Sequence, residues 1–328
     1  MLGHQKVLKT LRAAIKNNNV SHAYIFEGAN GIGKRETALA FSSVLMCEAE
    51  DGPCGKCKAC LLFQQGSHPD FQEIYAEDDK SISVENIRNL LKGLVIRPLY
   101  SEYKIFLINN ADKMTVQAQN ALLKSLEEPP PYVVFILAVQ SSAAMTPTIR
   151  SRCRRIFFNK LTYEEIMGIL KEKYGNSKPE WDFIVPYSDG VIGTAIGLLD
   201  SPHYLEIRDE VLDKVVQLLN SQDLDLFSLY GLFEKNDDKI DFILRVMLLF
   251  FRDMLVYRQT GDFRILINSD KKDMIIKNTG IKVSGIMKCI SAVWSAKKSL
   301  EVNANFQLAI EVMLMKIQQN SSKQSVVS

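Results

Sequence analysis

The stretch Gly28-Ala-Asn-Gly-Ile-Gly-Lys34-Arg35 nearly matches a phosphate-binding loop, and it decides the fold expected for the first part of the chain. An apolar run from Ala23 precedes the loop, and the segment KRETALAFSSVLMC that follows has helical spacing. The pattern G-x-x-x-x-G-K-[ST] needs a hydroxyl after its lysine as a magnesium ligand, and here that position is Arg35. The other loop residues can still face an anion with backbone N–H groups and an ammonium: Gly28, Gly31, Gly33 and Lys34.

The acidic half of such a nucleotide site is also missing. An active site has an acidic pair at the end of an apolar strand, one residue for magnesium and one to activate water. After the run KIFLI the sequence has Asn109 and Asn110 instead. An amide cannot take a proton from water and is a weaker magnesium ligand than a carboxylate. Unless Asp112, one turn farther on, is the true acid, we expect no ATPase activity; binding of ATP without hydrolysis stays open.

The pattern of apolar segments predicts an α/β domain followed by helices. In residues 1–160, strand-like runs such as 104–110 and 133–139 alternate with helical segments, one of which Thr115 could cap. Such alternation predicts a parallel sheet covered by helices on both faces. From Leu161 strand patterns stop, and Thr162 to Glu165 form a capping box. We expect a small helical domain over 161–203, a larger helical domain over 204–320 and a disordered tail at 321–328.

Composition limits the classes of function. The chain has 328 residues, is 47% hydrophobic and has 40 basic against 38 acidic residues, so nucleic-acid binding would need a local basic patch. The N-terminal residues lack the apolar core of a signal peptide, and the longest apolar runs are too short to span a bilayer. We therefore expect a soluble cytoplasmic protein without a membrane partner.

Four cysteines are spaced as metal ligands: Cys47-x6-Cys54-x2-Cys57-x2-Cys60. In a reducing compartment this spacing favours structural zinc held by four thiolates. An iron–sulfur cluster is the main competitor, but Gln64 stands where a ferredoxin run would have its fourth cysteine. Unliganded or oxidised thiols are the third alternative. His68 could also be a ligand, although a turn-forming role suits it better because four cysteines are already present.

The segment TIRSRCRRIFF concentrates positive charge. Arg150, Arg152, Arg154 and Arg155 fall within six residues. Taken alone, such a run is a solvated face or a patch for a phosphate backbone.

Five segments together resemble bacterial DNA polymerase III clamp-loader subunits of the AAA+ class. They are SHAYIFEGANGIGKRETALAFSSVLMC, the cysteine cluster with HPDF after it, NALLKSLEEPP (120–130), SRC (Ser151, Arg152, Cys153) and NANFQLAIEVMLMK (303–316). The ATPase members, gamma and tau, keep the loop hydroxyl, an Asp-Glu pair and an arginine in the lid domain. Here these positions are Arg35, Asn109 with Asn110, and Gly193. The features that remain, the zinc module and SRC, are those of the delta-prime branch.

The resemblance implies a function as well as a fold. It implies an AAA+ domain over 1–160 with a zinc module at 47–60, a lid domain over 161–203 and a collar for oligomerisation over 204–320. It further implies a subunit without ATPase activity that assembles with gamma or tau and delta, in a complex that places the sliding clamp on primed DNA. Arg152 would then act in trans, as an arginine finger at the ATP site of a neighbouring subunit. Two rival functions are an active ATPase with unusual magnesium ligands and a zinc-dependent DNA-binding module.

Overall fold

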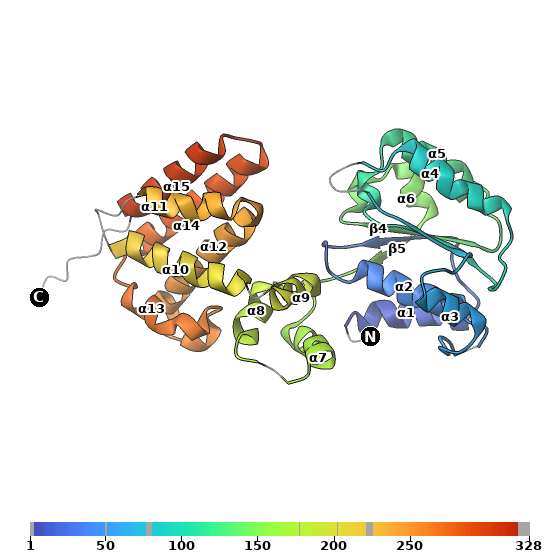
Figure 1. Cartoon of the computed structure of the whole chain (residues 1–328), viewed down its shortest axis with the longest axis horizontal. Coiled ribbons are helices and arrows are strands. Elements are labelled where there is room, and N and C mark those ends of the chain that lie inside the picture. The colour runs from blue at the N-terminus through green and yellow to red at the C-terminus, as the bar shows by residue number, and fades with distance from the viewer. Residues whose placement is uncertain are drawn as a thin grey trace, which may run out of the picture. The chain divides into compact units, whose positions relative to one another are not determined.

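The computed structural model describes residues 3–49, 51–76, 81–176, 178–201, 203–220 and 226–320. The chain divides into two compact units (Figure 1). The first consists of Met1–Gly175 and Asp189–Thr194, and the second of Asn176–Ser188 and Ala195–Ser328. The tail predicted to be disordered, 321–328, lies outside the described residues.

The first unit is built on a five-stranded parallel sheet in the order β2-β3-β4-β1-β5. Its strands are β1 (Ala23–Glu27), β2 (Phe71–Ile74), β3 (Lys104–Ile108), β4 (Val133–Val139) and β5 (Arg154–Phe157). The sequence predicted β1, β3 and β4 from their apolar runs, and all three are confirmed. It gave no comparable pattern for β2 and β5, which are four residues long and only partly buried.

Helices cover both faces of this sheet (Figure 1). Tyr24 and Phe26 of β1 pack with α1 and α2 on one face, whereas Ile25 packs with α4, α5 and α6 on the other, because successive strand residues point to opposite sides. The helices of this unit are α1 (Gln5–Lys16), α2 (Lys34–Leu45), α3 (Lys58–Gln64), α4 (Val84–Leu91), α5 (Val116–Glu127), α6 (Pro147–Arg152) and α7 (Tyr163–Tyr174), with 3₁₀ turns at Lys92–Val95, Ala111–Lys113 and Ser142–Ala144.

Two predicted helix starts are confirmed. The Thr115 side chain accepts a hydrogen bond from the amide of Ala118 at the start of α5, and Thr162 and Glu165 form a reciprocal capping box at the start of α7. The glycine loop between β1 and α2 and the turn after β3 both follow carboxyl ends of parallel strands. They therefore lie at the same edge of the sheet, where α/β proteins bind ligands.

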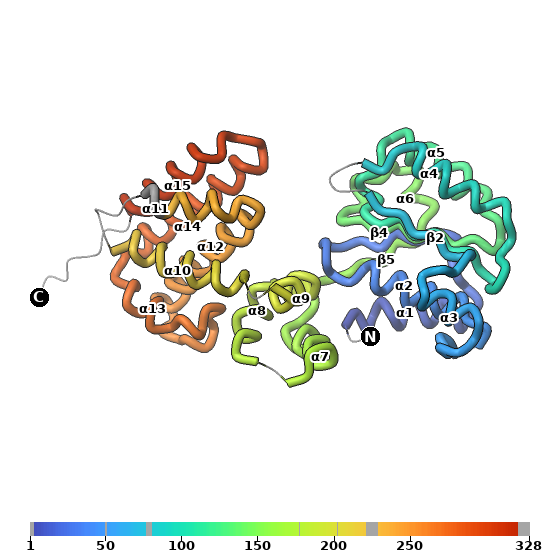
Figure 2. The backbone as a smooth tube through the Cα atoms, in the orientation of Figure 1, coloured from blue at the N-terminus to red at the C-terminus, as the bar shows by residue number. Residues whose placement is uncertain are grey.

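The second unit is helical, as predicted (Figure 2). Buried apolar side chains line one side of each long helix, for example Val215 of α10, Phe250 of α12, Val293 of α14 and Leu314 of α15. The helices are α8 (Trp181–Tyr187), α9 (Ile192–Asp200), which begins in the first unit, α10 (His203–Asn220), α11 (Leu226–Lys235), α12 (Ile240–Thr260), α13 (Lys272–Lys277), α14 (Val283–Glu301) and α15 (Phe306–Asn320), with 3₁₀ turns at Asp237–Lys239, Phe263–Ile265 and Ser269–Lys271.

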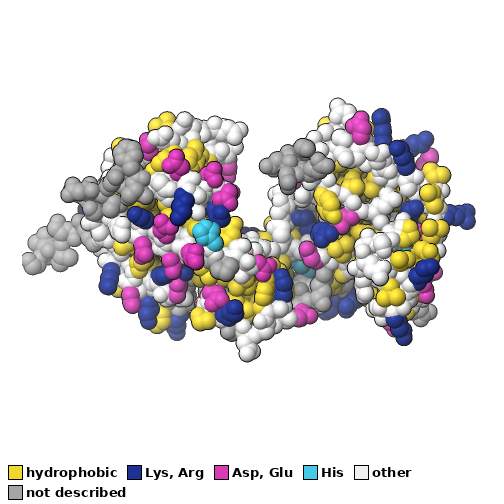
Figure 3. Space-filling model, in the orientation of Figure 1, with side chains coloured by type: hydrophobic (Ala, Val, Ile, Leu, Met, Phe, Trp, Pro, Cys, Tyr) yellow, Lys and Arg dark blue, Asp and Glu magenta, His cyan; other side chains and the backbone are white. Residues whose placement is uncertain are grey.

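Basic and acidic side chains are interspersed on the face that Figure 3 shows, in keeping with the near balance of charge in the sequence. Across the described ranges, no helix combines the length and the apolar character needed to cross a membrane.

Candidate functional site: a remodelled phosphate loop, a four-cysteine centre and an outward arginine

The ammonium group of the loop lysine contacts its own loop. Lys34 Nζ donates hydrogen bonds to the carbonyl oxygens of Gly28 (2.6 Å) and Ala29 (2.8 Å). The side chain is only 7% exposed, and burial lowers its pKa against the opposing effect of the Asp112 and Glu36 carboxylates. The Lys34 ammonium, which would contact a phosphate in an active site, is thus hydrogen-bonded to carbonyl groups of its own loop.

Arg35 stands where the loop pattern has a serine or threonine whose hydroxyl binds magnesium, and it belongs to an ion-pair network. Its Nε and Nη2 donate to the two carboxylate oxygens of Glu73 in β2, at 2.6 and 2.9 Å. Asn109 Nδ2 donates to Glu73 Oε1 at 2.7 Å. Glu73 is 11% exposed, and its hydrogen bonds to Arg35 raise the pKa of that guanidinium. The structure thus brings two of the predicted site residues, Arg35 and Asn109, to one carboxylate.

Asn110 and Asp112 take part in the turn after β3. Asn110 has φ 48°, in the left-handed region that asparagine tolerates better than most residues. The Asp112 carboxylate accepts a hydrogen bond from the amide of Gln140, just past β4 (3.2 Å). Asp112 is therefore within electrostatic reach of Lys34 but is engaged by the backbone that follows β4.

Two contacts hold the glycine loop from outside. The amide of Gly193, at the start of α9, donates to the carbonyl oxygen of Gly31 at 2.8 Å. The ring Nε2 of His4 lies 2.7 Å from the carbonyl oxygen of Ile32, within hydrogen-bond distance. A side chain at Gly193 has no room, because its Cβ would lie 2.8 Å from the Cα of Gly31. Gly193 therefore contributes a close backbone contact with the loop.

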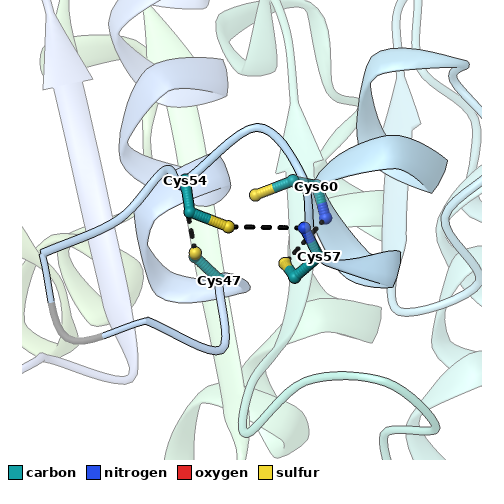
Figure 4. A group of neighbouring side chains, drawn as sticks. All are labelled: Cys47, Cys54, Cys57 and Cys60. Carbon is teal, nitrogen blue, oxygen red and sulfur yellow. Dashed lines mark hydrogen bonds between the residues drawn. The ribbon is translucent and has the colours of Figure 1, made fainter.

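The four predicted metal ligands converge (Figure 4). The Sγ atoms of Cys47, Cys54, Cys57 and Cys60 all lie within 4.8 Å of one another. Four thiolates at about 2.3 Å from one zinc ion would be about 3.8 Å apart, so a small contraction would complete a tetrahedral site. The predicted clustering is confirmed, and the four thiols could hold a metal ion.

Backbone amides and a glycine shape this cysteine centre. The amide of Cys54 donates to Cys47 Sγ (3.3 Å), and that of Cys57 donates to Cys54 Sγ (3.4 Å). Hydrogen bonds from the amides of Lys56 and Cys57 lower the pKa of Cys54 to about 6, whereas burial raises the pKa of Cys60 to about 12. Gly52 lets the loop pass close to the first ligand, because a Cβ there would lie 2.5 Å from Cys47 Cβ.

His68 lies outside the thiol group. Its Nδ1 accepts a hydrogen bond from the amide of Asp70 (3.1 Å), which fits the turn-forming role expected of it. Asp70 is 1% exposed, and its carboxylate accepts hydrogen bonds from the amides of Leu99 and Tyr100 (2.8 Å each). The HPDF motif therefore fixes the path of the chain before β3.

The SRC motif ends α6 and presents its arginine on the surface. Ser151 Oγ donates to the carbonyl oxygen of Thr148 (3.0 Å), and Cys153 packs against the core between the sheet and α5. Burial raises the pKa of Cys153 to about 12, so its thiol is a neutral anchor. Between these two residues, Arg152 is 34% exposed and its Nη2 lies 2.8 Å from Glu127 Oε1.

The other arginines of the basic segment do not form one patch with Arg152. Arg155 Nη2 donates to Glu27 Oε2 (2.8 Å), and its guanidinium lies 4.8 Å from the ring centre of Phe157. Arg154 is exposed on β5, and Arg150 is half-buried in α6. The segment thus separates into side chains with different surroundings.

Three residues of these sites were not expected from the sequence: Glu73, His4 and Glu127. The charge of Arg35 favours an acidic partner, but that rule alone does not single out Glu73, which lies 38 positions away. No comparable rule points to His4.

Comparisons with known proteins identify relatives of both parts of the chain. The family model described as DNA polymerase III, delta subunit, matches residues 3–162, and the model described as DNA polymerase III, delta subunit, C terminal, matches residues 202–319. A gamma subunit-related protein from Thermotoga maritima has a similar structure, with a TM-score of 0.55 and 20% identity, covering 96% of this chain and 99% of that one. The predicted parallel-sheet fold with a helical C-terminal region is thereby confirmed.

Relatives in sequence extend over most of the chain. The delta' subunit of Bacillus subtilis is 30% identical over 323 residues, which cover 96% of each protein. The delta' subunit of Pseudomonas aeruginosa is 41% identical over 136 residues, 40% of this chain and 42% of that one. The tau subunit of B. subtilis is 28% identical over 98% of this chain, which spans 61% of tau. The chain therefore belongs to the family of bacterial DNA polymerase III delta-prime subunits.

Proposed function

We propose that this chain is the non-hydrolysing subunit of a clamp loader, which assembles with gamma or tau and with delta to place the sliding clamp on primed DNA. The observation that carries this proposal is the pairing of Arg35 and Asn109 with Glu73. A guanidinium and an amide occupy the positions of two magnesium ligands, and each is satisfied by the same carboxylate. A divalent cation there would be repelled by Arg35 and would have to displace a hydrogen-bonded ion pair.

The surroundings of the loop support the same function. Lys34 is bound to loop carbonyls, and Gly193 contacts Gly31 where the ATPase relatives would place an arginine. A site that needs neither nucleotide nor metal can hold its loop and the start of α9 in one arrangement. We propose that the chain is a rigid member of the ring and that DNA synthesis is performed by other subunits of the polymerase.

The chemistry of this subunit would lie in Arg152. We propose that its guanidinium approaches the γ-phosphate bound by an adjoining gamma or tau subunit and offsets the charge that develops during hydrolysis. The placement of Arg152 on the surface, between an anchored Cys153 and a hydrogen-bonded Ser151, supports this role.

The helical unit offers a surface for these partners. On α15, Leu308, Val312 and Met315 are 61%, 37% and 47% exposed, and their spacing places them on one face of the helix. Trp294 of α14 is 56% exposed. Contiguous exposed apolar patches often mark protein interfaces, and this face of α15 is our candidate for one. We propose that residues 204–320 form the collar of the ring, that 161–203 form the lid, and that the assembly works in the cytoplasm, where its DNA is.

The metal of the cysteine centre is proposed to be zinc with a structural role. Cys47, Cys54, Cys57 and Cys60 offer four soft ligands, which matches closed structural zinc sites that leave no position for a substrate. When bound, zinc would cross-link the loop that joins α2 and α3.

Reconstitution tests the proposed function. The chain should co-purify with gamma or tau and delta of its own organism, and loading of a fluorescent clamp on primed DNA should require it. The purified chain should hydrolyse no ATP. Failure to join the complex would refute the subunit role, and hydrolysis that disappears in Lys34→Ala would refute the non-hydrolysing role. Salt-sensitive binding of primed DNA by the chain alone would instead favour a DNA-binding module.

A further inference from the structure

The motif NALLKSLEEPP places two acids at an unfavourable end of a helix. It forms the last part of α5, whose final residue is Glu127, and Glu128 follows as the capping residue. The carboxyl end of a helix carries a partial negative charge, so carboxylates there are disfavoured and cations are preferred. Departures from such local rules occur where function requires them. Glu127 and Glu128 belong neither to the glycine loop nor to the cysteine centre, so those sites do not explain why two acids stand here.

Glu127 compensates its position by contacting Arg152. The helices α5 and α6 pack against each other, and each ends at one member of the pair. Arg152 Nη2 lies 2.8 Å from Glu127 Oε1, while Nη1 donates to the carbonyl oxygen of Thr148 (3.0 Å) and to Ser151 Oγ (3.3 Å). The guanidinium is thus held from two helices.

This pair contributes little to the stability of the fold. Arg152 and Glu127 are 34% and 47% exposed, and ion pairs at exposed positions are weak because water and salt screen them. A guanidinium has five N–H groups, and the contacts that the structure describes leave some of them for a further acceptor. These contacts therefore orient the Arg152 guanidinium and still leave N–H groups that can bind an anion.

We propose that Glu127 is a positioning residue for Arg152. It holds the guanidinium in one orientation before the neighbouring subunit arrives, so that the remaining N–H groups face the phosphate of that subunit. A long flexible side chain fixed in advance loses less freedom when it binds, and the gain appears in the rate of the step that it stabilises. This inference rests on the proposed trans-acting role of Arg152. It assigns to the acidic motif a function in the hydrolysis carried out by a partner.

The test uses the assembled complex with clamp and primed DNA. The part of the total ATP turnover that Arg152→Ala abolishes defines the contribution of this finger. Glu127→Gln keeps the size and a hydrogen-bond acceptor but removes the charge, and it should lower that part about threefold, the scale expected for the loss of one exposed ion pair. The fall should be in kcat, with KM for ATP unchanged. The double variant Glu127→Gln/Arg152→Ala should be no slower than Arg152→Ala.

Glu128→Gln is the matched control, because among the described residues Glu128 is also exposed but makes no ion pair with Arg152. It should retain the full contribution, and both single variants should unfold like the wild-type chain. Equal turnover in Glu127→Gln and Glu128→Gln, while Arg152→Ala is slow, would overturn the positioning role alone. Wild-type turnover in Arg152→Ala would refute the trans-acting arginine itself, and the inference would fall with it.

Discussion

The amide nitrogen of Gly193 donates a 2.8 Å hydrogen bond to the carbonyl oxygen of Gly31, and this bond joins the start of α9 to the phosphate loop. The two backbones are so close that a Cβ on Gly193 would lie 2.8 Å from both the Cα and the carbonyl oxygen of Gly31. Neither backbone can move aside as a flexible side chain could. The contact therefore depends on glycine at position 193.

Gly193→Ala should destabilise the first unit by about 1–3 kcal/mol, the usual range for overpacking a tight contact. Urea unfolding measures this change. Gly197→Ala, four residues farther along α9, is the matched control because a Cβ there meets nothing within 4 Å. Alanine in a helix interior is favoured over glycine, so the control should gain about 0.5–1 kcal/mol. Equal effects at the two positions would show that the contact with Gly31 is not tight in solution.

The chain should show no ATP turnover that depends on Lys34. Arg35 repels the magnesium ion, and Asn109 cannot replace a carboxylate. Lys34→Ala is the control: a rate in the wild-type chain that this variant removes would mean that the site is active. The reconstructed variant Arg35→Thr/Asn109→Asp/Asn110→Glu should stay inactive as well, because Gly193 supplies no cation to the site.

The sequence predicts those parts of the site that depend on local spacing. The strand, loop and helix around Lys34 follow from residues next to one another, and the four cysteines lie within one short segment. Glu73 is different, because it pairs with Arg35 across 38 positions and comes from a strand without a marked apolar pattern. Register between distant strands decides such a contact, and one sequence does not contain that information.

The limits of the two units also depend on contacts between residues far apart in the sequence. Residues 189–194 follow segments of the second unit in sequence but cluster with the first. The amide of Leu161 donates to the carbonyl oxygen of Gly190 (2.9 Å), and Gly193 contacts Gly31, so tertiary hydrogen bonds hold this short segment beside the loop. Helical patterns alone do not reveal such bonds. The assignment of a lid and a collar stays a prediction.

Glu27, at the end of β1, should make stability depend on pH. Burial by itself raises its pKa, but the Arg155 guanidinium and the amide of Ser142 outweigh burial, so the pKa lies below its usual value. A carboxyl of this kind contributes stability above its unfolded pKa and loses it as the pH falls through the folded pKa. Glu27→Gln should therefore cost about 1 kcal/mol at neutral pH and nothing in strong acid. Urea midpoints of both chains at several pH values test this, and a difference that grows in acid would contradict it.

The cysteine centre should retain about one zinc ion per chain, the stoichiometry of a four-thiolate structural site. Elemental analysis of protein purified without added metal measures it. Cys57→Ser should release the metal and open the segment between α2 and α3 to proteases, because metal sites of this kind gain their structure on binding. Cys289→Ser is the control, since Cys289 lies in α14, outside the thiol group. Iron with a visible absorption band would identify a cluster instead.

Arg152 should act on a nucleotide that this chain does not bind. In the assembled complex, Arg152→Ala should lower partner-dependent ATP turnover only in part, because other sites of the ring keep their own arginines. At the affected site, fingers of this kind contribute on the order of 10³ to 10⁵ in rate. Clamp loading should fall further than total turnover, since it needs the subunits to act together.

Arg152→Lys should restore little of the activity lost in Arg152→Ala, because an ammonium has the charge but not the planar, forked donors of a guanidinium. Arg154→Ala is the better control than Arg155→Ala, since Arg155 pairs with Glu27 and its loss would also affect stability. If the segment were only a basic patch, Arg152→Ala and Arg154→Ala would lower ATP turnover and clamp loading equally. Equal effects of the two variants would therefore refute the arginine-finger role of Arg152.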